Sequence, residues 1–201
     1  MARRTLATDA FTRADENPLA GSWSTYSTLT NLQVVSNAVE AAAINTAIDN
    51  IESHTVTLPN DQWAQVTFSS WLGGAPYAGA GIGLRWAAPN TVSGYLFLMD
   101  KSGSQARCSI QKYTAGTLAN VGGSFTNLTI ANGDVFRFEA VGTQLTGFQN
   151  GAQVIQVASD ASFSSGRAAL EAYATVAVTD IVLDDFSAGD FVDDLMPQSI
   201  F

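Results

Sequence analysis

The clearest pattern in the sequence is a strict alternation of apolar and polar positions over residues 134–142. Phe136 and Phe138 fall on one face of this segment, and Arg137 and Glu139 fall on the other. A period of two predicts a β-strand with one buried face. Immediately downstream, two further strand-like runs are joined by Asn150-Gly151. This dipeptide readily adopts positive φ at both central turn positions, so the sequence predicts a tight β-hairpin here.

Six other runs have the length and composition of short strands. They cover residues 62–70, 79–85, 93–100, 106–114, 167–174 and 176–186. Turn-forming residues separate the runs at intervals of about ten to twenty residues, which is typical of antiparallel sandwiches. We therefore predict an all-β fold, a two-sheet antiparallel jelly-roll sandwich, in a single domain over residues 1–190, followed by a tail at 191–201.

The region 38–53 permits two interpretations. Ile44, Ile48 and Ile51 are spaced as on one face of a helix, but the run lacks a clear capping residue and several polar residues interrupt it. We favour a strand, a loop and a second strand, with a short helix as the alternative.

Charge and targeting signals narrow the class of protein. The chain has 18 acidic and 9 basic residues, a net charge of −9, which repels phosphate backbones and so excludes nucleic acid as a partner. No apolar run approaches the length of a membrane span, and the N-terminal residues lack the apolar stretch of a secretory signal. We expect synthesis in the cytosol without a signal peptide, and no membrane insertion.

The sequence shows no catalytic motif. Cys108 and His54 are the only residues of their types, so neither an internal disulfide nor a His- or Cys-rich metal site can form; we predict a core position for Cys108 and a structural role for His54. The five glutamates are isolated. A pair such as Glu139 with Glu171 across a sheet is permitted but not indicated, and we assign no catalytic residue.

Several short phrases occur together along the chain. They include Asp9-Ala-Phe-Thr-Arg-Ala-Asp15, Leu58-Pro-Asn-Asp-Gln62, Asn132-Gly-Asp134, Ser165-Gly-Arg167 and Leu183-Asp-Asp-Phe186. With the hairpin, this set resembles the concanavalin A-like lectin/glucanase superfamily, particularly its laminin-G-like jelly rolls, over about residues 9–190. The resemblance implies two curved sheets packed face to face, with the first strand, near Phe11, beside the last strand, near Phe186. Members of the superfamily include sugar-binding modules, glycoside hydrolases, adhesion domains and phage virion proteins, so the fold leaves the function open.

Aromatic side chains are the candidate ligand-binding groups, because a flat ring stacks on the face of a pyranose. Trp71 and Tyr77 flank a loop that contains Gly and Pro, and Arg85 and Trp86 end the next predicted strand. We predict that these four residues form a ligand-binding surface, with core filling as the alternative.

Two further groups of residues remain. The tail is rich in apolar side chains, namely Phe191, Val192, Leu195, Met196, Ile200 and Phe201. Because exposed apolar segments usually mark contacts, we expect the tail to dock on its own domain or on a partner subunit. The carboxylates Asp9, Asp180, Asp184 and Asp185 permit calcium as the one cofactor, with a solvated acidic sheet edge as the alternative.

Together these observations favour a non-catalytic structural or adhesive module of a larger assembly. A decoration or fibre protein at the surface of a phage virion fits best, as a homo-oligomer or in contact with other virion proteins, with a glycan as a further ligand. The alternatives are a free carbohydrate-binding module and, less favoured, a glycoside hydrolase.

Overall fold

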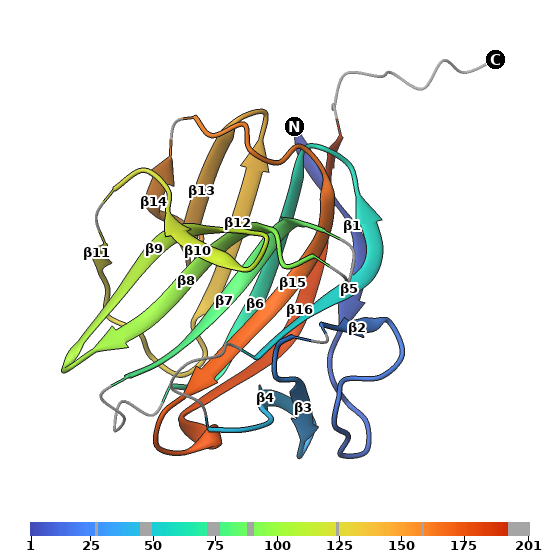
Figure 1. Cartoon of the computed structure of the whole chain (residues 1–201), viewed down its shortest axis with the longest axis vertical. Coiled ribbons are helices and arrows are strands. Elements are labelled where there is room, and N and C mark those ends of the chain that lie inside the picture. The colour runs from blue at the N-terminus through green and yellow to red at the C-terminus, as the bar shows by residue number, and fades with distance from the viewer. Residues whose placement is uncertain are drawn as a thin grey trace.

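Two antiparallel sheets of eight strands pack face to face in this computed structural model (Figure 1). The structure describes residues 1–26, 28–44, 50–71, 77–87, 91–123, 125–157 and 159–192. The two packed antiparallel sheets confirm the predicted all-β jelly-roll sandwich. Within the described residues, no helix is long and apolar enough to cross a membrane.

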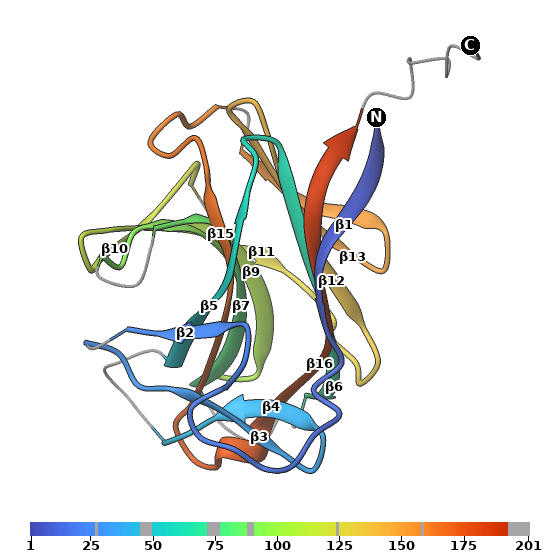
Figure 2. The ribbon, with the colours of Figure 1, turned by 90° about the vertical axis from the view of Figure 1, so that its right-hand side faces the viewer.

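The first sheet, sheet A, is built around the last strand of the chain. Its order is β14 (Ala152–Val157), β13 (Gln144–Gln149), β12 (Val135–Val141), β6 (Gln62–Trp71), β16 (Ile181–Val192), β4 (Ala38–Ala41) and β3 (Leu32–Val35), and β1 (Ala2–Asp9) also pairs with β16. Ala2 lies opposite Val192 and Asp9 lies opposite Phe186. The expectation that the first strand lies beside the last is thus confirmed, and both strands reach the same edge of the sandwich (Figure 2).

The second sheet, sheet B, contains the long central hairpins. Its order is β10 (Thr117–Asn120), β9 (Gln105–Thr114), β8 (Gly94–Ser102), β7 (Tyr77–Trp86), β15 (Gly166–Ala174), β5 (Asn50–Leu58) and β2 (Trp23–Thr25), and β11 (Thr126–Asn127) also pairs with β9. The edge strands β10 and β2 turn away from sheet A (Figure 2). The outer face of sheet B is therefore concave.

The predicted hairpin forms as expected. Asn150 and Gly151 both have positive φ, 50° and 82°, which joins β13 to β14 through the predicted two-residue turn. The Asn150 side chain holds the turn against β12, because its Oδ1 accepts a hydrogen bond from the backbone N–H of Val135 at 2.9 Å. Along β12, Phe136, Phe138 and Ala140 are fully buried, as the alternation predicts.

One predicted strand is partly wrong. Residues 178–180 of the run 176–186 form a short 3-10 helix, η1 (Val178–Asp180), and β16 begins only at Ile181. The Asp180 carboxylate accepts a hydrogen bond from the backbone N–H of Ala177, which closes a turn and interrupts the extended backbone. At its other end β16 continues to Val192, two residues beyond the predicted domain boundary.

The region 38–53 contains the strands that we favoured. β4 and β5 occupy residues 38–41 and 50–58. Ile44 is 52% exposed whereas Ile51 is 1% exposed, so these two side chains do not share a buried helical face. Ile48 lies outside the described residues.

Two apolar clusters hold the sandwich together. The larger cluster fills the space between the sheets and includes Cys108, where burial raises the pKa of the thiol to about 12; the predicted core position of this residue is confirmed. The smaller cluster, which we call the outer cluster, lies on the outer face of sheet B. It consists of Tyr26, Ile51, Trp86, Val92, Leu96, Leu98, Tyr113 and Ala169.

A row of glycines on β7 allows the outer cluster to pack closely. A Cβ atom on Gly81 would lie 2.5 Å from Leu96 Cδ1, and one on Gly83 would lie 2.7 Å from Ala169 Cβ. Real Cβ atoms do not approach other atoms so closely. These glycines therefore serve close packing between strands, and they do not form a phosphate-binding loop.

Candidate ligand-binding site

The structure does not bring the four predicted ligand residues together. Tyr77 begins β7, and Arg85 and Trp86 end it, so a strand of ten residues, about 30 Å long, separates the two groups. Trp71 ends β6, far from Arg85 along the neighbouring sheet. Tyr77 is 57% exposed, whereas Trp86 is fully buried in the outer cluster. The single surface that the sequence suggests is not present.

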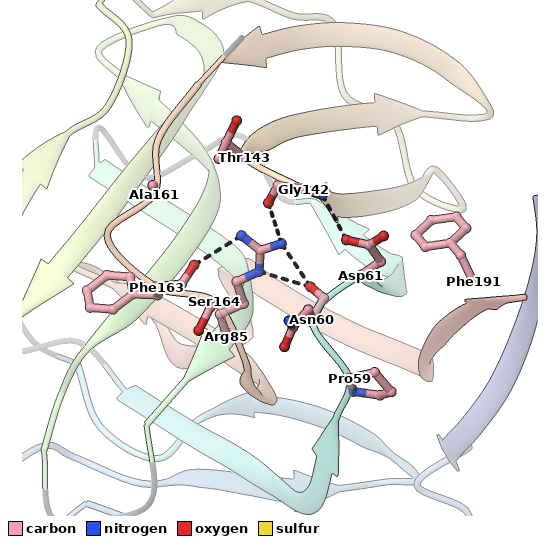
Figure 3. A pocket seen from close by; sticks show the side chains of 10 residues that line it. All are labelled: Pro59, Asn60, Asp61, Arg85, Gly142, Thr143, Ala161, Phe163, Ser164 and Phe191. Atoms are coloured by element: carbon pink, nitrogen blue, oxygen red, sulfur yellow. Dashed lines mark hydrogen bonds between the residues drawn. The ribbon is translucent and has the colours of Figure 1, made fainter.

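Arg85 has a structural role instead. Its side chain is buried and its backbone φ is 53°. The guanidinium donates hydrogen bonds to three backbone carbonyls: Asn60 O at 2.8 and 3.1 Å, Gly142 O at 2.7 Å and Phe163 O at 3.0 Å (Figure 3). These carbonyls belong to three connections, β5–β6, β12–β13 and β14–β15. One buried cation thus fixes three loops that are distant in sequence.

Burial also acts on the charge of Arg85. It lowers the pKa of the guanidinium, but the ordinary value is so high that the group stays protonated. Among the described residues, backbone carbonyl dipoles rather than an ion pair compensate the cation. Charge-assisted hydrogen bonds of this kind are shorter and stronger than neutral ones.

An open pocket of about 590 Å³ lies among the loops that Arg85 fixes (Figure 3). Its walls are Pro59, Asn60, Asp61, Arg85, Gly142, Thr143, Ala161, Phe163, Ser164 and Phe191. The Asp61 carboxylate accepts a hydrogen bond from the backbone N–H of Gly142 at 2.7 Å. That bond uses one oxygen and leaves the other able to accept from a ligand. We call this cavity the Arg85 pocket.

A second hydrogen-bond network holds the β14–β15 wall of the pocket. Tyr95 Oη donates to Asp160 Oδ1 at 2.6 Å, Lys112 Nζ donates to Asp160 Oδ2 at 2.9 Å, and the backbone N–H of Phe163 donates to Tyr95 Oη at 3.1 Å. Partial burial opposes ionisation of Asp160, but the bonds from Lys112, Tyr95 and Ser162 hold its pKa below the ordinary value. The loop is therefore fixed in place before any ligand arrives.

The side chains of the Arg85 pocket are suited to a polyhydroxylated ligand. Asp61 and Asn60 offer acceptors and an amide donor, and Thr143 and Ser164 offer hydroxyls. Phe191, half-buried on β16, adds an aromatic ring. Polar groups beside an aromatic ring are the usual composition of a site that binds small polar molecules.

Sequence reasoning found only part of this pocket. The sequence singled out Arg85 as part of a ligand-binding surface with Trp71, Tyr77 and Trp86, and Phe191 as part of a docking tail. The phrase Leu58-Pro-Asn-Asp-Gln62 appeared only as a fold signature, yet its Asn60 and Asp61 line the cavity. Phe191 and Val192 belong to β16, where they pair with Arg3 and Ala2. The remaining tail residues, Leu195, Met196, Ile200 and Phe201, lie outside the described residues.

Three of the four candidate calcium ligands accept hydrogen bonds from the protein itself, and the fourth, Asp185, is exposed. Asp9 accepts hydrogen bonds from Phe11 N, Arg13 Nη1 and Trp23 Nε1. Asp180 binds the backbone N–H of Ala177, and Asp184 binds that of Asp185. In the part of the chain that the structure describes, no group of three or more His, Cys, Asp or Glu side chains is placed to hold a metal ion.

Glu139 and Glu171 do not lie together as the sequence permitted. Glu139 lies on the outer face of sheet A, paired with Arg137 at 2.7 Å. Glu171 lies on β15 in sheet B, between the outward positions Gly81 and Ile51. The two carboxyl groups therefore lie on opposite faces of the sandwich and cannot act on one glycosidic bond.

Comparisons with known proteins identify the fold. No protein-family model matches the sequence, and a search of curated proteins found no match. Solved structures do match. A protein of unknown function with a galectin-like fold from Bacillus subtilis has a TM-score of 0.63 at 10% identity, covering 94% of this chain and 98% of its own. The carbohydrate-binding module CBM66 from Bacillus subtilis has a TM-score of 0.60 at 16% identity, covering 82% and 91%.

A third similar structure comes from a phage. The CBM2 module of the evolved Dit of Lactobacillus casei BL23 phage J-1 has a TM-score of 0.59 at 12% identity, covering 95% of this chain and 97% of its own. At these identities the likeness shows the fold alone. The chain has the jelly-roll fold of the concanavalin A-like lectin/glucanase superfamily, as its sequence phrases suggested.

Proposed function

We propose that this protein is a non-catalytic glycan-binding module that works as an adhesive part of a larger assembly, with the Arg85 pocket as its sugar site. The observation that carries the proposal is the construction of that pocket. Three loops are fixed by one buried guanidinium and present a carboxylate, an amide and two hydroxyls to solvent, and strand β16 adds the aromatic ring of Phe191. A pocket fixed in advance loses little entropy when a weakly binding sugar enters.

Hydrolysis is the less favoured alternative, because it needs two carboxyl groups on either side of the scissile bond. Among the described residues that line the Arg85 pocket, Asp61 is the one carboxylate. A single carboxylate suits recognition of neighbouring hydroxyls rather than acid and nucleophile chemistry.

The proposed setting is a phage virion, in a decoration or fibre protein. One observation supports it, the similar jelly roll in the evolved Dit of a phage. A free carbohydrate-binding module remains the alternative. Mass measurement in solution and pull-down with host cell envelopes separate the two settings.

The sugar site is tested by Asp61→Asn. The asparagine keeps an oxygen for the Gly142 N–H, so the loops stay in place, but it removes the charge that strengthens hydrogen bonds from ligand hydroxyls. We expect about tenfold weaker binding, measured by calorimetry, to the best ligand found on a glycan array. Phe191→Ala is expected to weaken binding to a similar extent through loss of the ring.

The matched control is Asp15→Ala. Asp15 is exposed and bonds the backbone N–H of Ser36 in the turn between β3 and β4, outside the Arg85 pocket, so its removal should leave binding unchanged. An array on which no glycan binds, or equal affinities for Asp61→Asn and the wild type, would contradict the proposed site.

A further inference from the structure

We propose a second ligand site, for a saccharide that carries a carboxylate, in a hollow of about 450 Å³ beside Trp71. Its walls include Trp71, Lys101, Ser104, Gln105 and Thr129. We call it the Trp71 hollow. None of its walls is shared with the Arg85 pocket, so the inference is independent of the proposed function.

The Trp71 side chain is held as a fixed platform. Its ring stacks on Phe68 with a centroid separation of 5.7 Å and an angle of 4° between the planes. Phe68 is fully buried in the core between the sheets, so it covers the inner face of the indole. The backbone N–H of Trp71 also donates to Asn132 Oδ1 at 2.7 Å. The uncovered part of the ring borders the hollow, where it can stack on a sugar.

Lys101 supplies a cation without a partner in the described protein. Its backbone is fixed in β8, opposite Ala78 of β7 and Ala106 of β9. Five other basic side chains are held in ion pairs with carboxylates: Arg4, Arg13, Arg107, Lys112 and Arg137. The half-buried Lys101 makes no such pair within the described residues, and it lines the hollow. An ammonium in that position favours an anion.

Gln105 completes the set with an oriented acceptor. Its Nε2 donates to Ala106 O at 2.7 Å and to Leu128 O at 3.2 Å, which fixes the amide and leaves Oε1 to accept from a ligand hydroxyl. The hollow thus offers a cation for a carboxylate, an indole for the apolar face of a sugar ring and an acceptor for a hydroxyl. A uronic acid carries all three complementary groups.

The same features argue against a polyanion. Lys101 is the one basic residue among the described walls of the hollow, and the protein has a net charge of −9, so a nucleic acid or a phosphate cluster would meet repulsion beyond the hollow. A sugar that carries one carboxylate on an otherwise neutral ring needs only one cation within reach. Its repulsion by the more distant acidic side chains of the protein is screened over about 10 Å at 0.1 M salt.

The experiment is an NMR titration of the full chain with galacturonic acid, with galactose as the neutral match. We expect galacturonic acid to shift the Trp71 indole N–H resonance and galactose to shift it much less. Lys101→Met keeps the aliphatic stem but removes the charge, and we expect it to weaken galacturonic acid binding about tenfold. Lys101→Arg keeps a cation and should retain most of the affinity.

The outcomes separate the two sites. Equal binding of galacturonic acid by Lys101→Met and the wild type, equal shifts with galactose, or no shift at Trp71 would each overturn the Trp71 hollow as an acid-sugar site. Asp61→Asn should leave the Trp71 response intact, and Lys101→Met should leave binding in the Arg85 pocket intact. Failure of either site is therefore visible while the other still works.

Discussion

Arg85→Met is expected to lower the free energy of unfolding by about 3–5 kcal/mol, because it removes the charge-assisted hydrogen bonds that the buried guanidinium donates to the carbonyls of three loops. The carbonyls of Asn60, Gly142 and Phe163 all receive their bonds from the one guanidinium. The three loops should then move independently, so ligand binding in the Arg85 pocket should fall even where the sandwich stays folded. Urea denaturation measures the first effect and calorimetry the second.

The matched control for this substitution is Arg3→Met. Arg3 is exposed on β1, with its guanidinium 5.4 Å from the Trp63 ring. Exposed contacts of this kind contribute up to about 1 kcal/mol, so the control should be close to the wild type. If Arg85→Met and Arg3→Met lowered the free energy of unfolding by similar amounts, the hydrogen bonds of Arg85 would contribute no more to stability than the contact of a surface arginine.

Glu52→Gln is expected to stabilise the protein by about 3 kcal/mol at pH 7. Glu52 is fully buried on β5, where its Oε1 accepts from the backbone N–H groups of Leu19 and Leu32 while Oε2 has no partner. Burial raises the pKa of this carboxyl from 4.5 to about 8, although the two hydrogen bonds oppose the rise. Glutamine has the shape of the protonated acid and keeps the acceptor oxygen.

The pH dependence distinguishes this effect from ordinary packing. Because the pKa of Glu52 is raised in the folded state, its contribution to stability is fully present below about pH 4.5 and is lost as the pH rises through about 8. Over that window it falls by about 1.4 kcal/mol per pH unit. The difference between Glu52→Gln and the wild type should therefore grow from pH 5 to pH 8 in urea titrations. A difference that stays constant over this range would show that Glu52 ionises equally easily in both states.

The scaffold was predictable because its signals are local. The alternation in β12 and the dipeptide Asn150-Gly151 each depend on neighbours in sequence, and both formed as expected. The exception at η1 is also local in origin, since the Asp180 carboxylate bonds a backbone N–H three residues away. Such a side-chain turn competes with a strand, and the apolar pattern alone gives no sign of it.

The Arg85 pocket was not predictable in the same way. The acceptors of Arg85 are backbone carbonyls, which every residue carries, so nothing in the identities of Asn60, Gly142 and Phe163 marks them as partners. The length of an extended strand, however, was sufficient to show that Tyr77 and Arg85 lie too far apart to share one site. Once residues 79–85 are taken as a strand, its two ends cannot contribute to one small site.

The pairing of β1 with β16 has a mechanical consequence. Because the strands are antiparallel and Ala2 lies opposite Val192, a force that pulls these two residues apart loads the interstrand hydrogen bonds one after another, as in opening a zip. A force between Val192 and a ligand in the Arg85 pocket takes another route, since Phe191 is a wall of that pocket. If the module is tethered through β16 and holds a ligand in the Arg85 pocket, the pulling force would act on the end of β16 and on the loops at the rim of the sandwich. The core between the two sheets would carry little of it.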